Sequence, residues 1–220
     1  MAPESKAPLA WSLVVPVKVL AQAKSRLTAL PDERRSRLAL AMAADTIAAA
    51  IRADVVAVVL LVTDDPEVGD AAGDLGAIVL ADEPAAGLNE ALGHGAAYSR
   101  GRWPDRGVAG LAGDLPALRA EEVTTALTAA AELRVAFVPD AGGTGTTMYA
   151  AAPGAQFRPR FGTLSRNRHL ADGAAEIAAG RQLAGLRRDV DTVDDLRQAA
   201  ELGLGPRTRA VLAADAEILS

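Results

Sequence analysis

The stretch Val108-Ala109-Gly110-Leu111-Ala112-Gly113-Asp114-Leu115-Pro116 organises our interpretation of this chain. It begins as an apolar run, which predicts a buried strand. Gly113 permits a tight bend, and Pro116 prevents the strand from continuing. Asp114 therefore lies at the carboxyl end of a strand, where open α/β sheets bind ligands. A carboxylate there can hold Mg²⁺, or it can cap the helix that follows.

On either side of this stretch, apolar runs typical of strands alternate with amphipathic runs typical of helices. The further predicted strands are 13–17, 55–62, 77–80, 135–139, 144–150 and 185–190. The predicted helices are 32–52, 65–73, 88–99, 121–132, 171–181, 192–202 and 206–218. This alternation predicts an α/β fold. We expect a flexible lead-in over 1–11 and one domain over 12–220.

The composition narrows the classes of function. The 220 residues are 50% hydrophobic, carry a formal net charge of −5 and include no cysteine. The acidic balance argues against nucleic acid as a partner, and disulfides and thiolate metal sites are excluded. No apolar stretch is long enough for a membrane span, and residues 1–10 show no signal-peptide pattern. We expect a cytoplasmic protein without a membrane partner; its apolar helices serve either its own core or a homodimer contact.

Lysine is rare, and its positions are informative. The chain has 20 Arg but three Lys, and Lys18 and Lys24 both follow the first predicted strand. Lysine and arginine differ as phosphate ligands, so these two lysines are candidates for contact with phosphates. The alternative is a solvated basic turn. Neither G-x-G-x-x-G nor a Walker P-loop is present.

Polar residues also follow the second predicted strand. Thr63 and Asp64 are candidates for contact with a nucleotide, whereas Asp65 before Pro66 is typical of a helix cap. Asn89, at the start of the helix predicted over 88–99, is a third candidate, because the free N–H groups of a helix start can face an anion or a base edge.

Two later segments carry charges of opposite sign. The loop predicted over 153–167 contains Arg158, Arg160 and Arg166, and so many cations in an acidic chain suit a small anionic substrate. Asp189 and Asp191 would lie on one face of the strand predicted over 185–190 and its continuation. With Asp114, they form a plausible oxygen site for Mg²⁺. The neighbouring Thr192 also fits a helix cap, so one of these acids can be purely structural.

Six short motifs occur in order along the chain. They are Pro16-Val17-Lys18 with Lys24-Ser25-Arg26-Leu27, Gly87-Leu88-Asn89, Gly113-Asp114-Leu115-Pro116, Gly143-Thr144-Gly145-Thr146-Thr147, Phe161-Gly162-Thr163-Leu164-Ser165 ahead of His169, and Asp189-Val190-Asp191-Thr192. In this order they resemble the guanylyltransferases of coenzyme F-420 biosynthesis, which use 2-phospho-L-lactate or, in bacteria, phosphoenolpyruvate. The resemblance extends from about residue 12 to about residue 213.

The resemblance implies a fold, a reaction and a set of site residues. The fold is a mixed sheet of the nucleotide-diphospho-sugar-transferase-like, Rossmann-like type, flanked by helices. The reaction is attack of a substrate phosphate on the α-phosphorus of GTP, with pyrophosphate leaving. The metal ligands would be Asp114, Asp189 and Asp191. The phosphorylated three-carbon acid would bind Thr146, Gly162 and Ser165, phosphate charge would meet Lys18 and Lys24, and the guanosine would lie near Asn89.

The resemblance favours phosphoenolpyruvate as the acid, on the bacterial, Arg- and Ala-rich character of the chain. The same chemistry on 2-phospho-L-lactate or 3-phospho-D-glycerate remains an alternative. A nucleotidyltransferase for another cofactor, such as molybdopterin, would predict a Gly-rich first loop that this chain lacks. A non-catalytic nucleotide-binding sensor domain would not need all three aspartates. The product would pass to the next enzyme of the coenzyme pathway.

Overall fold

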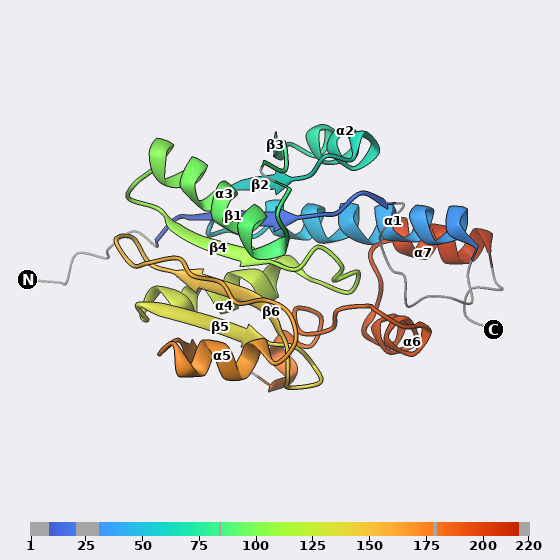
Figure 1. Ribbon diagram of the computed structural model, residues 1–220. Helices are drawn as coiled ribbons and strands as arrows, with labels where there is room; N and C mark the ends of the chain where they lie inside the picture. The colour runs from blue at the N-terminus through green and yellow to red at the C-terminus, as the bar shows by residue number, and fades with distance from the viewer. Residues whose placement is uncertain (1–8, 21–30, 84, 178–179, 216–220) are drawn as a thin grey trace, which may run out of the picture.

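A computed structural model describes residues 9–20, 31–83, 85–177 and 180–215 (Figure 1). Its seven-stranded sheet has the order β3-β2-β1-β4-β6-β5-β7. The strands are β1 (Trp11–Pro16), β2 (Val56–Val62), β3 (Ile78–Leu80), β4 (Gly107–Leu111), β5 (Val135–Pro139), β6 (Thr146–Ala151) and β7 (Ala175–Glu176). The helices are α1 (Asp32–Ile51), α2 (Pro66–Asp74), α3 (Leu88–Arg102), α4 (Ala120–Ala131), α5 (Ser165–Ala171), α6 (Val193–Leu202) and α7 (Pro206–Ala214).

The sheet is mixed, as the sequence analysis expected. β3, β2, β1 and β4 run parallel, whereas β6 pairs antiparallel with both β4 and β5. β5 and β7 pair in parallel at the far edge. The carboxyl ends of β1, β2, β4 and β5 therefore all meet at one edge of the sheet, and β6 begins there.

Strand β1 lies at the centre of the core. Every residue of β1 is buried, because helices cover both faces of the sheet at this point. Leu13 and Val15 pack into the cluster formed with α1 and α4, whereas Val14 packs on the opposite face with residues of α3. This alternation follows from the two-residue period of a strand.

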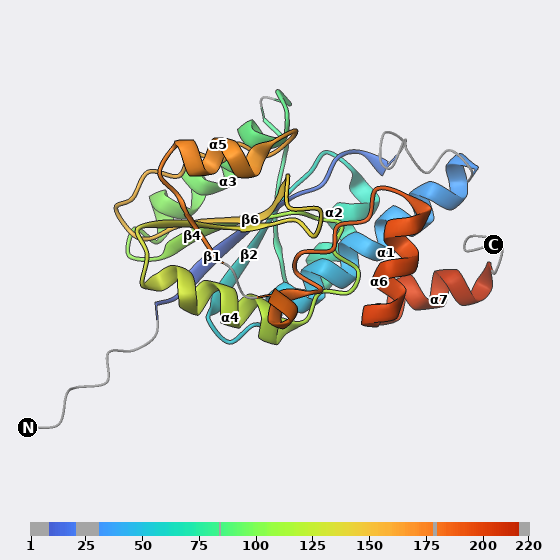
Figure 2. The same ribbon diagram turned by 90° about the horizontal axis from the view of Figure 1, so that it is seen from below.

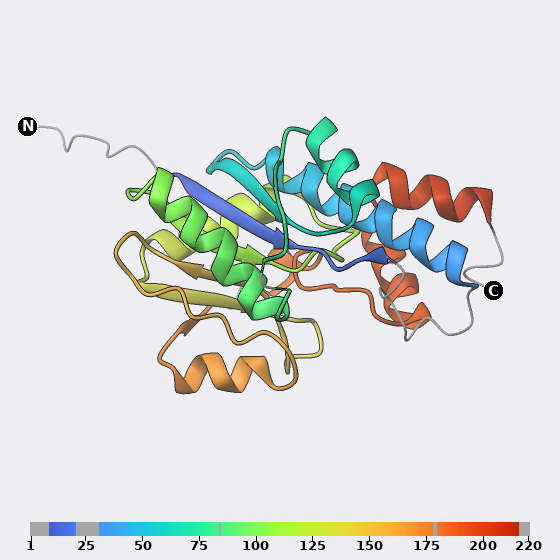
Figure 3. The ribbon, with the colours of Figure 1, turned by 45° about the horizontal axis from the view of Figure 1, so that its top comes forward.

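Figure 2 shows the two helical layers, with α3 and α5 on one face of the sheet and α1 and α4 on the other. Beyond the carboxyl end of β1, α6 and α7 form a further layer against α1 (Figures 1 and 3). Leu38 and Met42 of α1 pack there with Leu196 and Ala199 of α6. The layers confirm the single α/β architecture and leave the carboxyl edge of the sheet next to α6.

Several expected elements or element boundaries are wrong. The segment 185–190 forms turns and irregular backbone instead of a strand, and the helix expected over 171–181 is absent from the residues described there. A helix instead occupies Ser165–Ala171, inside and beyond the end of the loop expected over 153–167. Gly145 precedes β6 instead of lying within the strand expected over 144–150.

Of the lead-in expected over 1–11, residues 1–8 lie outside the described residues. Trp11 is fully buried in β1, so the ordered sheet begins one residue before the expected boundary at residue 12. Among the described residues, no helix is both long and apolar enough to cross a membrane. The cytoplasmic location stays a prediction.

Candidate active site

The loop after β4 is fixed by hydrogen bonds to four different parts of the chain. Ala112 N–H donates to the Thr147 carbonyl of β6 at 2.8 Å. The Asp114 carbonyl accepts from the Val190 N–H (3.1 Å), and the Pro116 carbonyl accepts from the Gly205 N–H (2.7 Å). The Leu115 N–H donates to the Thr46 hydroxyl (3.0 Å). The backbone on which Asp114 stands is therefore held by β6, α1, the segment before α6 and the residue before α7.

Gly113 lets this loop approach the end of β1 closely. A Cβ atom at Gly113 would lie 2.9 Å from Val17 Cγ2 and 3.2 Å from the Pro16 carbonyl oxygen. Only glycine leaves enough room for the two strand ends to lie side by side. Lys18 comes directly after Val17 in the chain and is exposed, whereas Lys24 lies outside the described residues.

Asp114 does not cap a helix. The next helix, α4, begins at Ala120 and takes Arg119 as its N-cap residue. The helix-cap interpretation of Asp114 is therefore wrong. Asp65 and Thr192 do cap helices, as expected: Asp65 accepts from Glu67 N–H and Val68 N–H, and Thr192 forms a capping box with Asp195.

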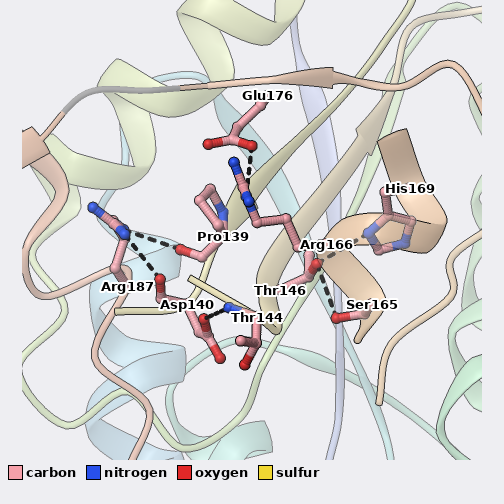
Figure 4. A network of polar contacts seen from close by, with 9 residues as sticks. All are labelled: Pro139, Asp140, Thr144, Thr146, Ser165, Arg166, His169, Glu176 and Arg187. Atoms are coloured by element: carbon pink, nitrogen blue, oxygen red, sulfur yellow. Dashed lines mark hydrogen bonds and ion pairs between the residues drawn. The ribbon is translucent and has the colours of Figure 1, made fainter. Parts of the chain in front are cut away.

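Side chains, together with backbone hydrogen bonds to the loops after β4 and β5, hold the segment that carries Asp189. The buried Glu122 carboxylate accepts from the Gly185 N–H at 2.7 Å. Arg187 points back toward the end of β5, where its guanidinium donates to the carbonyls of Pro139 (3.1 Å) and Asp140 (2.9 Å) (Figure 4). The segment is thus fixed in irregular backbone and not as the strand predicted over 185–190. The segment still reaches the predicted place, because Val190 N–H bonds Asp114.

Four carboxylates influence one another at this edge. Burial first, then the charges of Asp114, Asp140 and Asp191, raise the pKa of Asp189 to about 7. Excess negative charge in a half-buried place is the condition that a divalent cation relieves, and carboxylate oxygens are its preferred ligands. Among the described side chains, no three acidic or histidine groups are yet arranged to chelate an ion. The carboxylate oxygens are of the kind that Mg²⁺ prefers as ligands.

Asp140 was not among the predicted site residues. It follows β5, and its Oδ1 accepts from the Thr144 N–H at 2.9 Å (Figure 4). A Cβ at Gly145 would overlap Asp140 Oδ2, so the absence of a side chain at this glycine leaves room for the carboxylate. The signal that identifies Asp140 in the sequence is its position after a predicted strand, at the same sheet edge as Asp114.

Thr146 and Ser165, both predicted substrate contacts, lie together beside His169 (Figure 4). Ser165 Oγ is 3.1 Å from Thr146 Oγ1, and His169 Nδ1 is 3.0 Å from the same atom. The β4–β6 register pairs Leu111 with Met148, so its continuation by two residues sets Thr146 opposite Gly113. The hydroxyl pair therefore borders the loop that carries Asp114.

The loop before α5 presents backbone donors. Gly162 is exposed with φ +114°, and Leu164 has φ +56°. No hydrogen bond of the Gly162 N–H is found within the part of the chain that the structure describes. Asn89 holds this loop: its Nδ2 donates to the Phe161 carbonyl (3.1 Å), and its Oδ1 accepts from the Phe161 N–H (2.8 Å). Asn89 thus links α3 to the predicted substrate loop, and its contact with the guanosine stays a prediction.

Two of the three arginines of the predicted cationic loop have acidic partners. Arg160 pairs with Asp172 (3.0 Å), and Arg166 pairs with Glu176 (2.8 Å; Figure 4). The third, Arg158, is exposed. The loop is therefore less positive than its sequence suggests.

The predicted nucleotide contacts after β2 line a cavity. Its volume is about 830 Å³, and Thr63, Asp64 and Asp65 are among its lining residues. The Thr63 side chain is buried, and Asp64 Oδ1 accepts from the Asp82 N–H at 2.9 Å. Burial, followed by the Asp64 charge, raises the pKa of Asp82, and Lys18 is close enough to oppose that rise. The remaining lining residues belong to α2, to β3 and to the residue after β3, so the cavity lies at the β3 edge of the sheet, and Lys18 is not among its lining residues.

Comparison with solved structures finds proteins with the same fold. A protein of Desulfovibrio desulfuricans G20 that is assigned as a nucleotide-diphospho-sugar transferase superposes with a TM-score of 0.69, covering 95% of this chain and 96% of that one, at 16% identity. The CMP:2-keto-3-deoxy-manno-octonic acid synthetase complexed with CTP gives 0.51, over 88% and 98% of the two chains, at 16% identity. These likenesses confirm the expected fold.

Sequence comparison identifies the family. Residues 11–202 match the family described as Guanylyl transferase CofC like. The phosphoenolpyruvate guanylyltransferase of Thermomonospora curvata is 54% identical over 94% of this chain and 90% of its own length. That of Streptomyces avermitilis is 53% identical over 92% and 94%. The family match and these relatives agree with the motif order of the sequence, and the chain belongs to the CofC-like guanylyltransferase family.

Proposed function

We propose that the chain transfers GMP from GTP to phosphoenolpyruvate and releases pyrophosphate. A phosphate oxygen of the acid attacks the α-phosphorus of GTP, and the bond from that phosphorus to the bridging oxygen of pyrophosphate breaks. The product is enolpyruvoyl-2-diphospho-5'-guanosine, a precursor for coenzyme F-420 that would pass to the next enzyme. Two relatives more than half identical over nearly the whole chain carry this activity in their names, which supports the choice of acid.

One observation about the site carries the chemistry of this proposal: the Asp114 carboxylate and the Thr146–Ser165 hydroxyl pair lie at the ends of adjacent strands. Asp114 follows β4, and Thr146 begins β6, which pairs with β4. Phosphoryl-type transfer depends on positioning and charge neutralisation, and needs no covalent group from the protein. The acidic side suits a metal–phosphate complex, and the hydroxyl side suits a small anion.

Each predicted residue has a role in this scheme. Asp114, Asp189 and Asp191 would hold Mg²⁺, which when bound neutralises and aligns the phosphates of GTP. The Thr146 and Ser165 hydroxyls and the Gly162 N–H would donate to the acid. Lys18 and Lys24 would meet phosphate charge, and Thr63, Asp64 and Asn89 would surround the nucleoside.

The test is pyrophosphate release from GTP and Mg²⁺ with each of three acids: phosphoenolpyruvate, 2-phospho-L-lactate and 3-phospho-D-glycerate. We expect phosphoenolpyruvate to be used best. An Asp114→Asn variant should lose at least about a hundredfold in turnover, because a metal ligand contributes several kcal/mol to transition-state stabilisation. Asp105→Asn is the matched control, since Asp105 is exposed before the opposite end of β4.

The outcomes separate the alternatives. Release with 2-phospho-L-lactate alone would reassign the acid, and use of CTP in place of GTP would reassign the base. No release with any acid, combined with GTP binding unchanged by Asp114→Asn, would favour the sensor domain instead. The relatives' names do not favour that alternative.

A further inference from the structure

His169 is a buried polar side chain with no role so far in the proposed reaction. It is fully buried on α5, and both of its ring nitrogens contact polar groups. Nε2 accepts a hydrogen bond from the Arg160 N–H at 2.8 Å, and Nδ1 lies 3.0 Å from Thr146 Oγ1. The imidazole therefore connects the backbone before the Gly162 loop to the hydroxyl pair.

The backbone contact fixes the tautomer of His169. A peptide N–H can only donate, so Nε2 must carry a lone pair toward Arg160. A neutral imidazole has a single N–H, which must then be on Nδ1. Burial among the rings of Phe137, Tyr149 and Phe161 keeps the ring neutral, since it lowers the pKa of His169 from 6.5 to about 4. Nδ1–H therefore donates to Thr146 Oγ1.

This tautomer determines how many protons the hydroxyl pair offers to a ligand. Thr146 and Ser165 have one hydroxyl proton each, and their mutual hydrogen bond uses one of them. Because His169 donates, the second proton stays available for an outside acceptor. With the opposite tautomer, Nδ1 would accept the Thr146 proton, and the pair would have none left to donate.

The available proton points to an anionic partner. Thr146 keeps 8% exposure, whereas Ser165 and His169 have none, so Thr146 is the member of the group that a ligand can reach. Phosphate and carboxylate oxygens only accept hydrogen bonds, and a donor hydroxyl in a buried place suits them. The Gly162 N–H lies in the loop that begins next to the Arg160 contact.

We propose that His169 is a positioning residue, which orients the Thr146–Ser165 pair as a hydroxyl donor to an anionic oxygen of the acid substrate. This inference rests on the proposed function. His169 touches neither the substrate nor the reacting atoms. It acts through Thr146, and it also holds the backbone of the substrate loop at Arg160.

Two substitutions separate the two hydrogen bonds of His169. His169→Asn keeps a donor near Cβ, where Nδ1 lies, and gives up the Arg160 contact. His169→Gln keeps an acceptor for Arg160 and gives up the donor to Thr146. We expect the KM for phosphoenolpyruvate to rise about 10- to 100-fold in His169→Gln and clearly less in His169→Asn. The KM for GTP should stay within about twofold in both variants, unlike the response to a general loss of structure.

A double-mutant cycle tests the coupling to Thr146. Thr146→Val removes the hydroxyl with little change of shape and should itself raise the KM for phosphoenolpyruvate. In that background His169→Gln should add less than about twofold. Fully additive effects, or equal changes in KM for both substrates, would overturn the inference. Phe157→Leu is the packing control, because Phe157 contacts Tyr149 in the same aromatic cluster.

A measurement without substrate keeps the inference separate from the proposed function. The chain has two histidines, so nitrogen NMR of the 15N-histidine-labelled protein can be assigned with a His94→Asn variant. We expect His169 to carry its proton on Nδ1 near neutral pH. A proton on Nε2 would overturn the inference even if the enzyme is active. An inactive wild-type enzyme with the Nδ1–H tautomer would instead contradict the proposed function.

Discussion

Asp189 has a pKa of about 7, raised by burial and by the carboxylates of Asp114, Asp140 and Asp191. A group with a raised pKa holds its proton over a wider pH range, so near neutral pH Asp189 exchanges between the acid and the carboxylate. Only the carboxylate is a good ligand for a divalent cation. The chemistry of a single residue thus links proton and metal binding at the candidate site.

The affinity for Mg²⁺ should therefore rise between about pH 6 and about pH 8, and level off above the pKa. One unit below the pKa, the apparent Kd should be about tenfold weaker, because one proton must leave before the ion binds. Calorimetric titration in buffers with different ionisation enthalpies measures both the affinity and the protons released. An affinity that is flat over this range, with no proton released, would contradict the prediction. Asp189→Asn should abolish the pH dependence.

At the scale of an element, α7 depends on a side chain from α1. Its N-cap residue is Gly205, which has no side chain to cap the helix. Asp45 takes that role: it accepts from the N–H groups of Arg207 (3.2 Å) and Thr208 (2.8 Å). Gly205 also donates to Pro116, two residues beyond Asp114. The cap of α7 therefore contributes to the support of the Asp114 loop.

We expect Asp45→Ala to lower the free energy of unfolding by about 2 kcal/mol, because it removes the cap and leaves buried N–H groups without partners. Asp32→Ala is the matched control on the same helix, since the Asp32 side chain is 91% exposed and pairs with Arg35 of its own helix. It should cost about 0.5 kcal/mol or less. Urea unfolding of both variants measures the difference, and equal losses would contradict the assigned role.

The elements up to residue 151 were well predicted, because their hydrophobic periodicity matches their packing. Helix α1 was expected over 32–52 and spans Asp32–Ile51. The larger errors lie between 165 and 191, where Glu122 and Arg187 make hydrogen bonds with backbone groups 63 and 48 residues away. Local pattern contains no information about such long-range partners.

The candidate site was predicted unevenly for the same reason. Motif order predicted that Thr146 and Ser165 act together, and the two hydroxyls do lie in hydrogen-bond contact. The role of Asn89 as the anchor of Phe161 was not predicted, because α3 and that loop are far apart in the sequence. Asp140 was overlooked because a turn after a strand has an ordinary local explanation.

At the scale of the whole molecule, stability and acidity are linked through His169. Its pKa in the folded protein is about 4, whereas its ordinary value is 6.5. Between these values the unfolded chain binds more protons than the folded one, so stability must fall as the pH falls. The contribution is fully present above about pH 6.5 and is lost as the pH approaches 4. Asp189 has the opposite effect on stability: because its pKa is raised, its contribution to stability is lost as the pH rises toward 7.

The size of this effect is best measured as a difference between proteins. We expect the wild-type protein to lose about 3 kcal/mol more stability than His169→Gln between about pH 7 and about pH 4. Urea unfolding at a series of pH values gives both curves, and the contribution of Asp189 cancels in the comparison. His94→Gln shows whether the effect belongs to His169. Parallel curves for wild type and His169→Gln would contradict the prediction.

The hydrogen bond from Val190 N–H to the Asp114 carbonyl joins two segments that are made at different times during synthesis. Asp114 emerges from the ribosome 75 residues (189 − 114) ahead of Asp189. At bacterial translation speeds this interval lasts roughly 4 to 15 seconds. Throughout it a nascent chain with β1 to β4 already made has an incomplete acidic edge. The proposed metal site can therefore assemble only after the last quarter of the polypeptide has been made, and a chain released before residue 189 would lack two of the three proposed ligands, Asp189 and Asp191.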